Sequence, residues 1–337
     1  MGMKPFEYQR PASLGEALEL KARFGGEAAW LAGGTDLLPR AKQALAKPAM
    51  VISLADLAGE LGGISQDGGF LTLGSMASLH QVAGHPTVAA KLPGLVRAVR
   101  SIGAYTLQRH AGTIGGNVML ETRCLYYNQS EFWRSGLAPC FKLGGEVCHP
   151  GGATADRCRS AFSGDGAVML AALGARVALK SASGSRELPF DEFFTGKGET
   201  PTAIAADELL CAIKVPLPPA GEASAYHKVA WRGAVDYPLV SAAARLRIAD
   251  GQVTEAALYL GAAFAAPLAL RDAMNELTGQ PASQDSLARA AAKASRHAEP
   301  FFLDNLGATR EWRAEMAGVA AKRVLFEALR LAEGNND

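Results

Sequence analysis

The chain concentrates its cysteines in one stretch, residues 122–159. Cys124, Cys140, Cys148 and Cys158 lie there, separated by 15, 7 and 9 residues. Thiolates bind soft metals, and four of them are the ligand set of a [4Fe–4S] cluster. The stretch shows no apolar periodicity of its own, so it could be organised around a metal centre. Metal binding would then offset the entropy lost when the stretch becomes ordered. We therefore expect these four cysteines to hold such a cluster.

Other interpretations of these cysteines stay open. Structural zinc usually takes two closely spaced C-x(2–4)-C pairs, and no pair here is that close. Disulfides and unrelated free thiols are further alternatives, and His149 is an additional candidate ligand beside Cys148. Cys211 lies in the apolar run LLCAIKV and is expected to be a buried apolar residue.

Two glycine motifs indicate a second kind of site. The first is AGGTD at residues 32–36, directly after the β-like run 28–31, and the second is GTIGGN at residues 112–117. Paired glycines let backbone amides approach a ligand closely, and consecutive amides in a turn suit a phosphate. Neither motif is a Rossmann fingerprint or a P-loop. They indicate a dinucleotide or phosphate site, or two ordinary tight turns.

Alternating short elements surround these motifs. Ser13 opens a capping box with Glu16 at the start of a helix. Apolar runs at residues 50–54 and 70–73 indicate strands, and apolar residues on one face indicate a helix over 93–102. The alternation predicts an α/β arrangement for this part of the chain.

A change of domain is expected at the proline-rich segment 216–222. Before it, residues 167–175 are expected to form a helix that ends near Gly174, and residues 176–180 a strand. After it, three β-like runs precede two helices, of which the last begins near Thr309.

Composition excludes several classes of protein. The chain has 337 residues, 49% hydrophobic content and a net charge of +1, with no basic run that would bind nucleic acid or a membrane surface. No apolar run approaches the roughly 20 residues of a membrane span, and the first residues contain no signal-peptide core. We expect a cytoplasmic protein that binds neither nucleic acid nor membrane.

The order of the motifs resembles a known family. AGGTD is followed by TIGGN after Arg109 and His110, then by AFSGDGAVMLAALGARVAL, DELLCAIKVPLP and AYHKVAWRGAVDYPLVSAAARL. This series resembles the medium, FAD-binding subunit of the molybdenum hydroxylase family, which includes xanthine dehydrogenase and CO dehydrogenase. The resemblance covers nearly the entire chain.

The resemblance implies an α+β fold in two domains. Residues 1–218 would form an FAD-binding domain of the vanillyl-alcohol-oxidase (PCMH) type, made of two α/β subdomains, with the cysteine-rich insertion at about 121–161. Residues 222–332 would form a domain like the CO dehydrogenase flavoprotein C-terminal domain. FAD would lie between the two.

The resemblance also implies which residues bind FAD. The first phosphate loop corresponds to residues 31–38, the second to four residues of TIGGN, and three single residues complete the site. The implied residues are Leu31, Ala32, Gly33, Gly34, Thr35, Asp36, Leu37, Leu38, Thr113, Gly115, Gly116, Asn117, Asp165, Leu210 and Lys228.

Two of these residues have simpler explanations as well. Asp165 could be the N-cap of the helix that follows it, and Lys228 a solvated lysine on a strand. At the position where xanthine dehydrogenases place an aromatic side chain over the flavin, this chain has Gly103, and the nearby Tyr105 could partly replace it. NAD binding is therefore not carried over.

Within the family, the insertion is similar to that of the β subunit of 4-hydroxybenzoyl-CoA reductase. This implies an electron-transfer subunit that carries FAD and a [4Fe–4S] cluster, without catalytic residues of its own. Expected partners are a molybdopterin-binding large subunit and a [2Fe–2S] small subunit in a dimer of heterotrimers, with ferredoxin as electron donor for reductive dehydroxylation of an aromatic acyl-CoA. Alternatives are a related molybdenum dehydrogenase with outward electron flow, a self-sufficient flavoenzyme, and a zinc-binding interaction protein without flavin.

Overall fold

The computed structural model describes residues 3–334, so residues 1–2 of the predicted first domain lie outside it. The N-terminal part begins with a parallel three-stranded sheet in the order β1-β3-β2. Ser13 accepts a hydrogen bond from the Glu16 amide, but the Glu16 carboxylate accepts from Ala12 rather than from Ser13. The elements are β1 (Glu7–Gln9), α1 (Leu14–Phe24), η1 (Gly25–Glu27), β2 (Ala28–Leu31), α2 (Leu37–Lys42), β3 (Met50–Ser53), η2 (Ala55–Leu57) and α3 (Ala58–Leu61).

A second sheet of five strands, in the order β4-β5-β8-β6-β7, is antiparallel throughout. Short helices cover it. Its strands are β4 (Ile64–Asp67), β5 (Phe70–Gly74), β6 (Arg176–Ser181), β7 (Gly184–Pro189) and β8 (Leu209–Pro216). The helices of this part are α4 (Leu79–Gly84), α5 (Pro86–Lys91), α6 (Pro93–Arg100), α7 (Gln108–Ala111), α8 (Ile114–Val118), α10 (Asp165–Ala172) and α11 (Phe190–Phe193).

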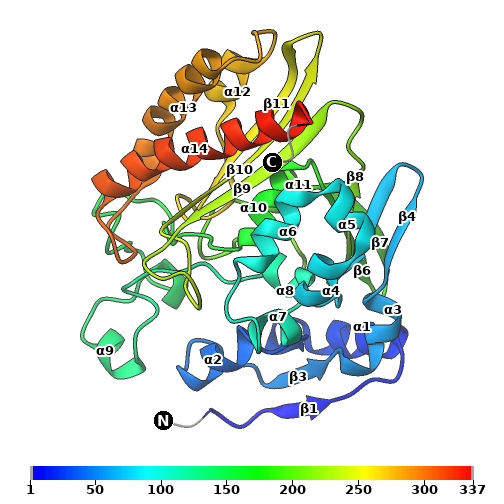
Figure 1. The fold of residues 1–337 in the computed structure, drawn as a ribbon. Helices are drawn as coiled ribbons and strands as arrows, with labels where there is room; N and C mark the ends of the chain where they lie inside the picture. The colour runs from blue at the N-terminus through cyan, green and yellow to red at the C-terminus, as the bar shows by residue number, and fades with distance from the viewer. Residues whose placement is uncertain (1–2, 335–337) are drawn as a thin grey trace.

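The C-terminal part is an antiparallel sheet in the order β12-β11-β10-β9, with α14 crossing one face and α10 and α6 packed on the other (Figure 1). Three helices follow the sheet where the sequence predicted two. The elements are β9 (Glu222–Val229), β10 (Val240–Ala249), β11 (Gln252–Gly261), β12 (Leu268–Ala269), α12 (Arg271–Leu277), α13 (Gln284–Ala298), η4 (Glu299–Phe301) and α14 (Arg310–Ala332).

Small residues on β10 let helices pack on both faces of this sheet. Successive side chains of a strand point to opposite faces, so Ala243 joins the core around α10 while Ala242 and Ala244 join the core under α13 and α14. All eight residues of α10 are buried, and Gly174 (φ +67°) ends the turn after it. Helix α10 is therefore the shared layer that fixes the two parts of the chain against each other.

The cysteine-rich insertion forms a long excursion with little regular structure. Its two ends meet in an antiparallel bridge, in which Arg123 and Ala161 exchange both backbone hydrogen bonds, of 2.7 and 2.8 Å. It contains α9 (Glu131–Ser135), which lies at the edge of the molecule, and η3 (Phe141–Leu143). No helix among residues 3–334 is long and apolar enough to cross a membrane.

Candidate cofactor site

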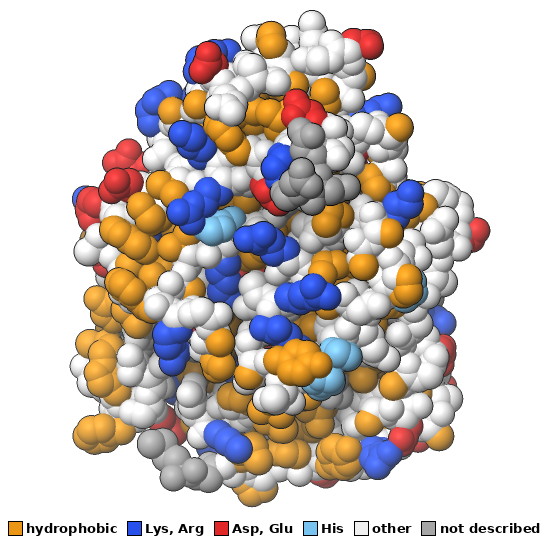
Figure 2. Space-filling model, viewed as in Figure 1, with side chains coloured by type: hydrophobic (Ala, Val, Ile, Leu, Met, Phe, Trp, Pro, Cys, Tyr) orange, Lys and Arg blue, Asp and Glu red, His pale blue; other side chains and the backbone are white. Residues whose placement is uncertain are grey.

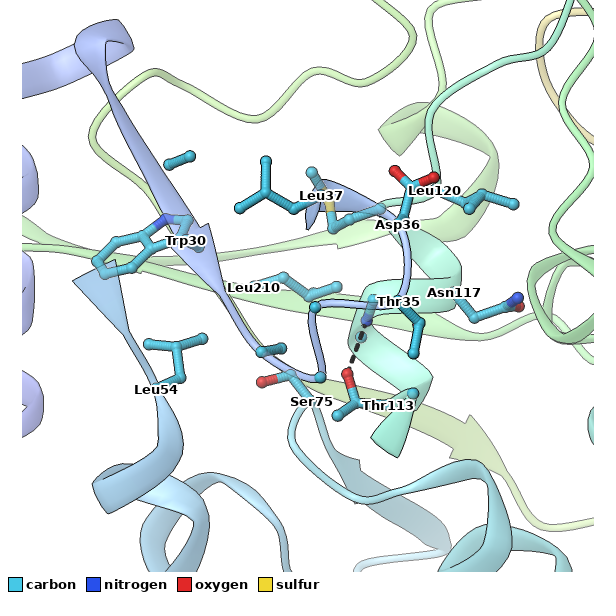
Figure 3. Close-up of a pocket in the computed structure, with 18 of the residues that line it drawn as sticks. Trp30, Thr35, Asp36, Leu37, Leu54, Ser75, Thr113, Asn117, Leu120 and Leu210 are labelled. Carbon is cyan, nitrogen blue, oxygen red and sulfur yellow. Dashed lines mark hydrogen bonds between the residues drawn. The ribbon is translucent and has the colours of Figure 1, made fainter. Parts of the chain in front are cut away.

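A cavity of ≈ 540 Å³ lies where β2, α8, β8 and the loop 235–237 converge. Segments far apart in sequence line it, including both glycine motifs. Figure 3 shows the turn with Thr35 and Asp36 beside the helix that carries Asn117, and Leu37 and Leu210 near Trp30. The cavity thus has a polar end built from turns and a more apolar end built from strands.

The first glycine motif forms the turn between β2 and α2. Gly34 has φ +70°, which glycine adopts without strain. Gly33 approaches the other motif so closely that a Cβ there would lie 1.7 Å from the Ala111 carbonyl oxygen. Only glycine fits at residue 33, and this is why the two loops can share one cavity.

The second glycine motif forms the start of α8. The Thr113 hydroxyl accepts a hydrogen bond of 3.0 Å from the Gly116 amide, marked in Figure 3. A Cβ on Gly115 would lie 2.6 Å from that of Ser75, so this glycine is also required for close packing. The backbone of the motif therefore packs closely against Ser75, the residue after β5, and residues of the same motif line the cavity.

Unpaired polar atoms face this cavity. The buried hydroxyls of Ser75 and Ser163 and the Nε of Arg40 have no hydrogen-bond partner among residues 3–334, and all three residues line the cavity. Leaving a buried polar group unpaired costs about 1–3 kcal/mol. Together with the glycine turns, these groups fit a ligand that carries many hydrogen-bond acceptors, as a dinucleotide does.

The apolar end fits planar rings. Leu54, Ile102 and Leu210 line it, with Trp30 at one edge. Leu210 thus lines the cavity, and its contact with a cofactor stays a prediction. Leu31 and Leu38 are not among the lining residues; both pack against Gly34, on which a Cβ would lie 3.3 and 3.0 Å from them. They support the turn instead of forming the cavity wall.

Asp165 is buried and joins the two parts of the chain. Its carboxylate accepts hydrogen bonds from Tyr226 and from Lys228, the latter at 2.8 Å. Burial raises the pKa of Asp165, and the Lys228 charge opposes that rise. The cap of α10 is Gly164, and the side chain of Asp165 makes no cap bond, so the helix-cap interpretation of Asp165 is wrong.

Lys228 does not line the main cavity. Its ammonium donates to the Ser101 carbonyl at 3.0 Å, to Asp165, and to the Asp236 carbonyl at 2.7 Å. A lysine has three donors, so all are used. Lys228 lines a neighbouring hollow, on the far side of Asp165, and the interpretation as a solvated strand lysine is also wrong.

Two other predicted contacts look different in the structure. Asn117 lines the cavity, but its side-chain oxygen accepts from the Ala167 amide at 3.1 Å, at the start of α10. Tyr105 is 57% exposed and packs edge-on against His80 and His110. Tyr105 does not line the cavity. It therefore does not replace the aromatic side chain that is missing at position 103, where this chain has glycine.

A charge network links the first glycine loop to the insertion. Arg40 pairs with Asp36 at 3.5 Å and with Glu121 at 3.0 Å, and Arg123 pairs with Asp36. Lys142, from within the insertion, is the second partner of Glu121. Burial works to raise the pKa of Glu121, but the charges of Lys142 and Arg40 outweigh it, so the net pKa is lowered.

Three of the four insertion cysteines are buried near one another. Cys124, Cys148 and Cys158 are 5–7% exposed. Burial raises the pKa of Cys124 to about 11, and the nearby Cys158 and Cys148 add to the rise. The half-buried Cys140 pairs through its backbone with Val147, the neighbour of Cys148. All five cysteines of the chain are free.

These thiols are not arranged around a single ion. Among residues 3–334, no group of three or more His, Cys, Asp or Glu side chains is placed to hold a metal ion. His149 lies instead against the Ala138 carbonyl and the Tyr126 ring. The structure gathers the cysteines in one region without assembling them into a metal centre.

Sequence reasoning missed several lining residues. Lys21 and Gln108 reach the cavity from α1 and α7, and Ser75 reaches it from the residue after β5; no local motif marks them. Trp30 lies two residues before the first glycine motif, so its position was a usable signal. Its indole donates to the Glu208 carbonyl at 3.0 Å, which links β2 to the start of β8.

Comparison with known proteins adds to this geometry. Residues 4–218 match the family described as the FAD binding domain in molybdopterin dehydrogenase. Residues 224–328 match the CO dehydrogenase flavoprotein C-terminal domain. The two matches follow one another along the chain, as the order of motifs in the sequence implies.

Individual relatives align over most of their length. The chain is 31% identical to the carbon monoxide dehydrogenase medium chain of Afipia carboxidovorans, covering 96% of each chain. It is 26% identical to the nicotinate dehydrogenase FAD-subunit of Eubacterium barkeri, covering 85% of this chain and 83% of that one. The structure is similar to a chain of reconstituted CO dehydrogenase from Oligotropha carboxidovorans, with a TM-score of 0.77, 29% identity and coverage of 98% and 99%.

Proposed function

Because the chain belongs to the family of FAD-binding subunits of molybdenum hydroxylases, we propose that it is the electron-transfer subunit of a heteromeric oxidoreductase similar to 4-hydroxybenzoyl-CoA reductase. FAD exchanges either one or two electrons, which suits a carrier between centres of different kinds. The observation that carries the proposal is the cavity itself, where two glycine turns meet unpaired hydroxyls and an apolar end.

The chain's own residues have separable tasks at the flavin. The turns around Gly33 and Gly115 would hold the pyrophosphate, with Ser75 and Ser163 as hydroxyl donors. Leu54, Leu210 and Ile102 would pack against the rings and exclude water. Asp165 and Lys228 would hold the loop 235–237 over the cavity, since Lys228 bonds the Asp236 carbonyl.

We also propose that Cys124, Cys140, Cys148 and Cys158 bind a [4Fe–4S] cluster. A cluster distributes four thiolates over four iron atoms, so its ligands need not surround one point. Three buried thiols in one region supply the soft donors that it requires. Burial raises the pKa of Cys158, and the Lys142 charge opposes that rise. Binding would close the insertion around the cysteines.

The proposed partners are a molybdopterin-binding large subunit, a [2Fe–2S] small subunit in a dimer of heterotrimers, and ferredoxin as the donor. The insertion supports an interface, because it exposes large apolar side chains, with Phe132 88% exposed and Trp133 43%. With the cysteines on the donor side, electrons would flow inward, toward the partner's molybdenum. A related dehydrogenase with outward flow is the second candidate.

Anaerobic purification of the full chain tests these proposals. We expect about one FAD per chain, with about four iron and four sulfide. Cys148→Ser should lose the iron and keep the FAD, whereas the control Cys211→Ser, on β8, should keep both. Stoichiometric zinc, or a chain that cannot be loaded with iron and sulfide, would exclude the cluster, and substrate turnover by the isolated chain would indicate a self-sufficient flavoenzyme.

A further inference from the structure

A second concave region lies on the other side of Lys228 from the cofactor cavity. Two hollows, of ≈ 350 and ≈ 650 Å³, share Arg97, Tyr226 and His227 in their walls. Arg97 comes from α6, His227 from β9, and Arg323, in the larger hollow, from α14. Figure 2 shows Lys and Arg side chains gathered on this face, over α6, β9 and α14. Below, Arg97, His227 and Arg323 are called the basic triad.

Within residues 3–334, no carboxylate pairs with the arginines of the triad. The guanidinium group of Arg97 has no hydrogen-bond or ion-pair partner among residues 3–334. Arg323 donates one hydrogen bond, of 2.8 Å, to Nε2 of His227. An arginine only donates, so this nitrogen must be the acceptor and the imidazole is neutral. Four of the five donors of Arg323 and all those of Arg97 remain available.

Nearby carboxylates are already engaged or distant. Glu327 pairs with Arg330 at 3.2 Å, and Asp236 pairs with Arg232 at 3.5 Å. Glu333, the C-cap residue of α14, also lines the larger hollow but lies ten residues beyond Arg323, about 15 Å along the helix axis. In the part of the chain that the structure describes, two guanidinium groups therefore lie beside one imidazole with no carboxylate paired to them, and an anionic ligand would remove their mutual repulsion.

We propose that the basic triad is a binding site for a phosphate group. A phosphate oxygen accepts from guanidinium donors in paired geometry, and two arginines match its double negative charge. All three triad residues line the larger hollow, and Arg97 and His227 also line the smaller one, so the rest of a larger ligand has room on either side. The proposal concerns a different surface from the flavin cavity and does not depend on the cysteine cluster.

Titration calorimetry on the FAD-loaded full chain tests it, since bound FAD fills the other phosphate-binding region. We expect pyrophosphate to bind above a sodium chloride control at equal ionic strength. Arg323→Gln and Arg97→Gln should each weaken binding by about tenfold or more, because each removes charge-assisted hydrogen bonds of about 1.5–3 kcal/mol. Arg10→Gln, which changes an exposed arginine that follows β1 and lines neither hollow, should change nothing.

The source of the phosphate is distinguished by the choice of ligand. ADP that binds more tightly than pyrophosphate would identify a nucleotide-like ester, and equal or weaker ADP binding would identify free inorganic phosphate. The proposal is overturned if pyrophosphate gives no more heat than chloride, or if both Gln variants bind as the parent does with unchanged melting temperatures. Binding of polyglutamate without binding of phosphate would also overturn it, in favour of an acidic protein partner.

Discussion

At the scale of single residues, Asp165 and Lys228 form a buried pair whose loss would be costly. Asp165 is 3% exposed, and its ion pair with Lys228 joins α10 to β9. Removing one member of a buried pair leaves an uncompensated charge. The pair is therefore a structural requirement at the edge of the flavin cavity, whatever its effect on flavin chemistry.

We predict that Lys228→Met destabilises the protein by about 3–5 kcal/mol at pH 7. Urea unfolding of the FAD-free chain measures this, and Lys91→Met, on an exposed site in α5, should stay within about 0.5 kcal/mol. A loss below 1 kcal/mol in Lys228→Met would mean that water or other donors compensate Asp165.

The pH dependence of that variant follows from the sign of the Asp165 shift. Burial raises the pKa of Asp165 above its ordinary 3.8, so protonation favours the folded state. The contribution of Asp165 to stability is thus greatest below pH 3.8 and declines as pH rises through the folded pKa. Without the Lys228 charge the pKa of Asp165 rises further, so Lys228→Met should lose stability over a wider pH range than the parent.

At the scale of elements, the two glycine loops depend on each other. Gly33 touches the backbone at Ala111, so a side chain there must push the first loop away from the second. The geometry of the phosphate end is therefore set by one contact between two turns that are about 80 residues apart in the chain.

We predict that Gly33→Ala lowers FAD affinity by at least about tenfold and costs about 1–3 kcal/mol of stability, because the added methyl group overpacks backbone. Fluorescence titration with FAD and urea unfolding measure the two effects. Gly59→Ala is the matched control: no atom lies within 4 Å of its added Cβ, and alanine should stabilise α3 by up to about 1 kcal/mol. Unchanged FAD affinity in Gly33→Ala would remove this loop from the flavin site.

Local sequence predicted the elements that local interactions determine. The strand at residues 28–31, the glycine turn after it and the break at Gly174 all appear as expected, because turns and short apolar runs depend on near neighbours. The α+β fold and its FAD-binding family followed from the order of motifs. Contacts across the chain could not be predicted: the side of Asp165 on which Lys228 lies depends on how β9 pairs with β10 and packs on α6.

At the scale of the molecule, Glu121 couples the insertion to the flavin loop. It accepts from Arg40, which also holds Asp36, and from Lys142 inside the insertion. The lowered pKa of Glu121 means that its contribution to stability is present above its ordinary 4.5 and is lost as pH falls through the folded pKa. Events in the cysteine region can therefore reach the cofactor loop through two ion pairs.

We predict that Glu121→Gln both loosens the insertion and weakens FAD binding. Lost charge-assisted bonds of about 1.5–3 kcal/mol correspond to about tenfold faster proteolysis within residues 122–160, with several-fold weaker FAD binding. Glu131→Gln, an exposed insertion residue that pairs with Lys47, should alter neither. Faster proteolysis with unchanged FAD affinity would show that the network supports the insertion alone.

The bridge between Arg123 and Ala161 has a consequence for the history of this chain. Because two backbone hydrogen bonds hold the ends of the insertion side by side, a short reverse turn could join them directly. The segment between them could therefore be inserted into the chain or deleted from it in a single event, while β2, α8 and α10 kept their positions. The proposed cluster could then be gained or lost together with this one segment, while the domain that carries the glycine loops keeps its fold.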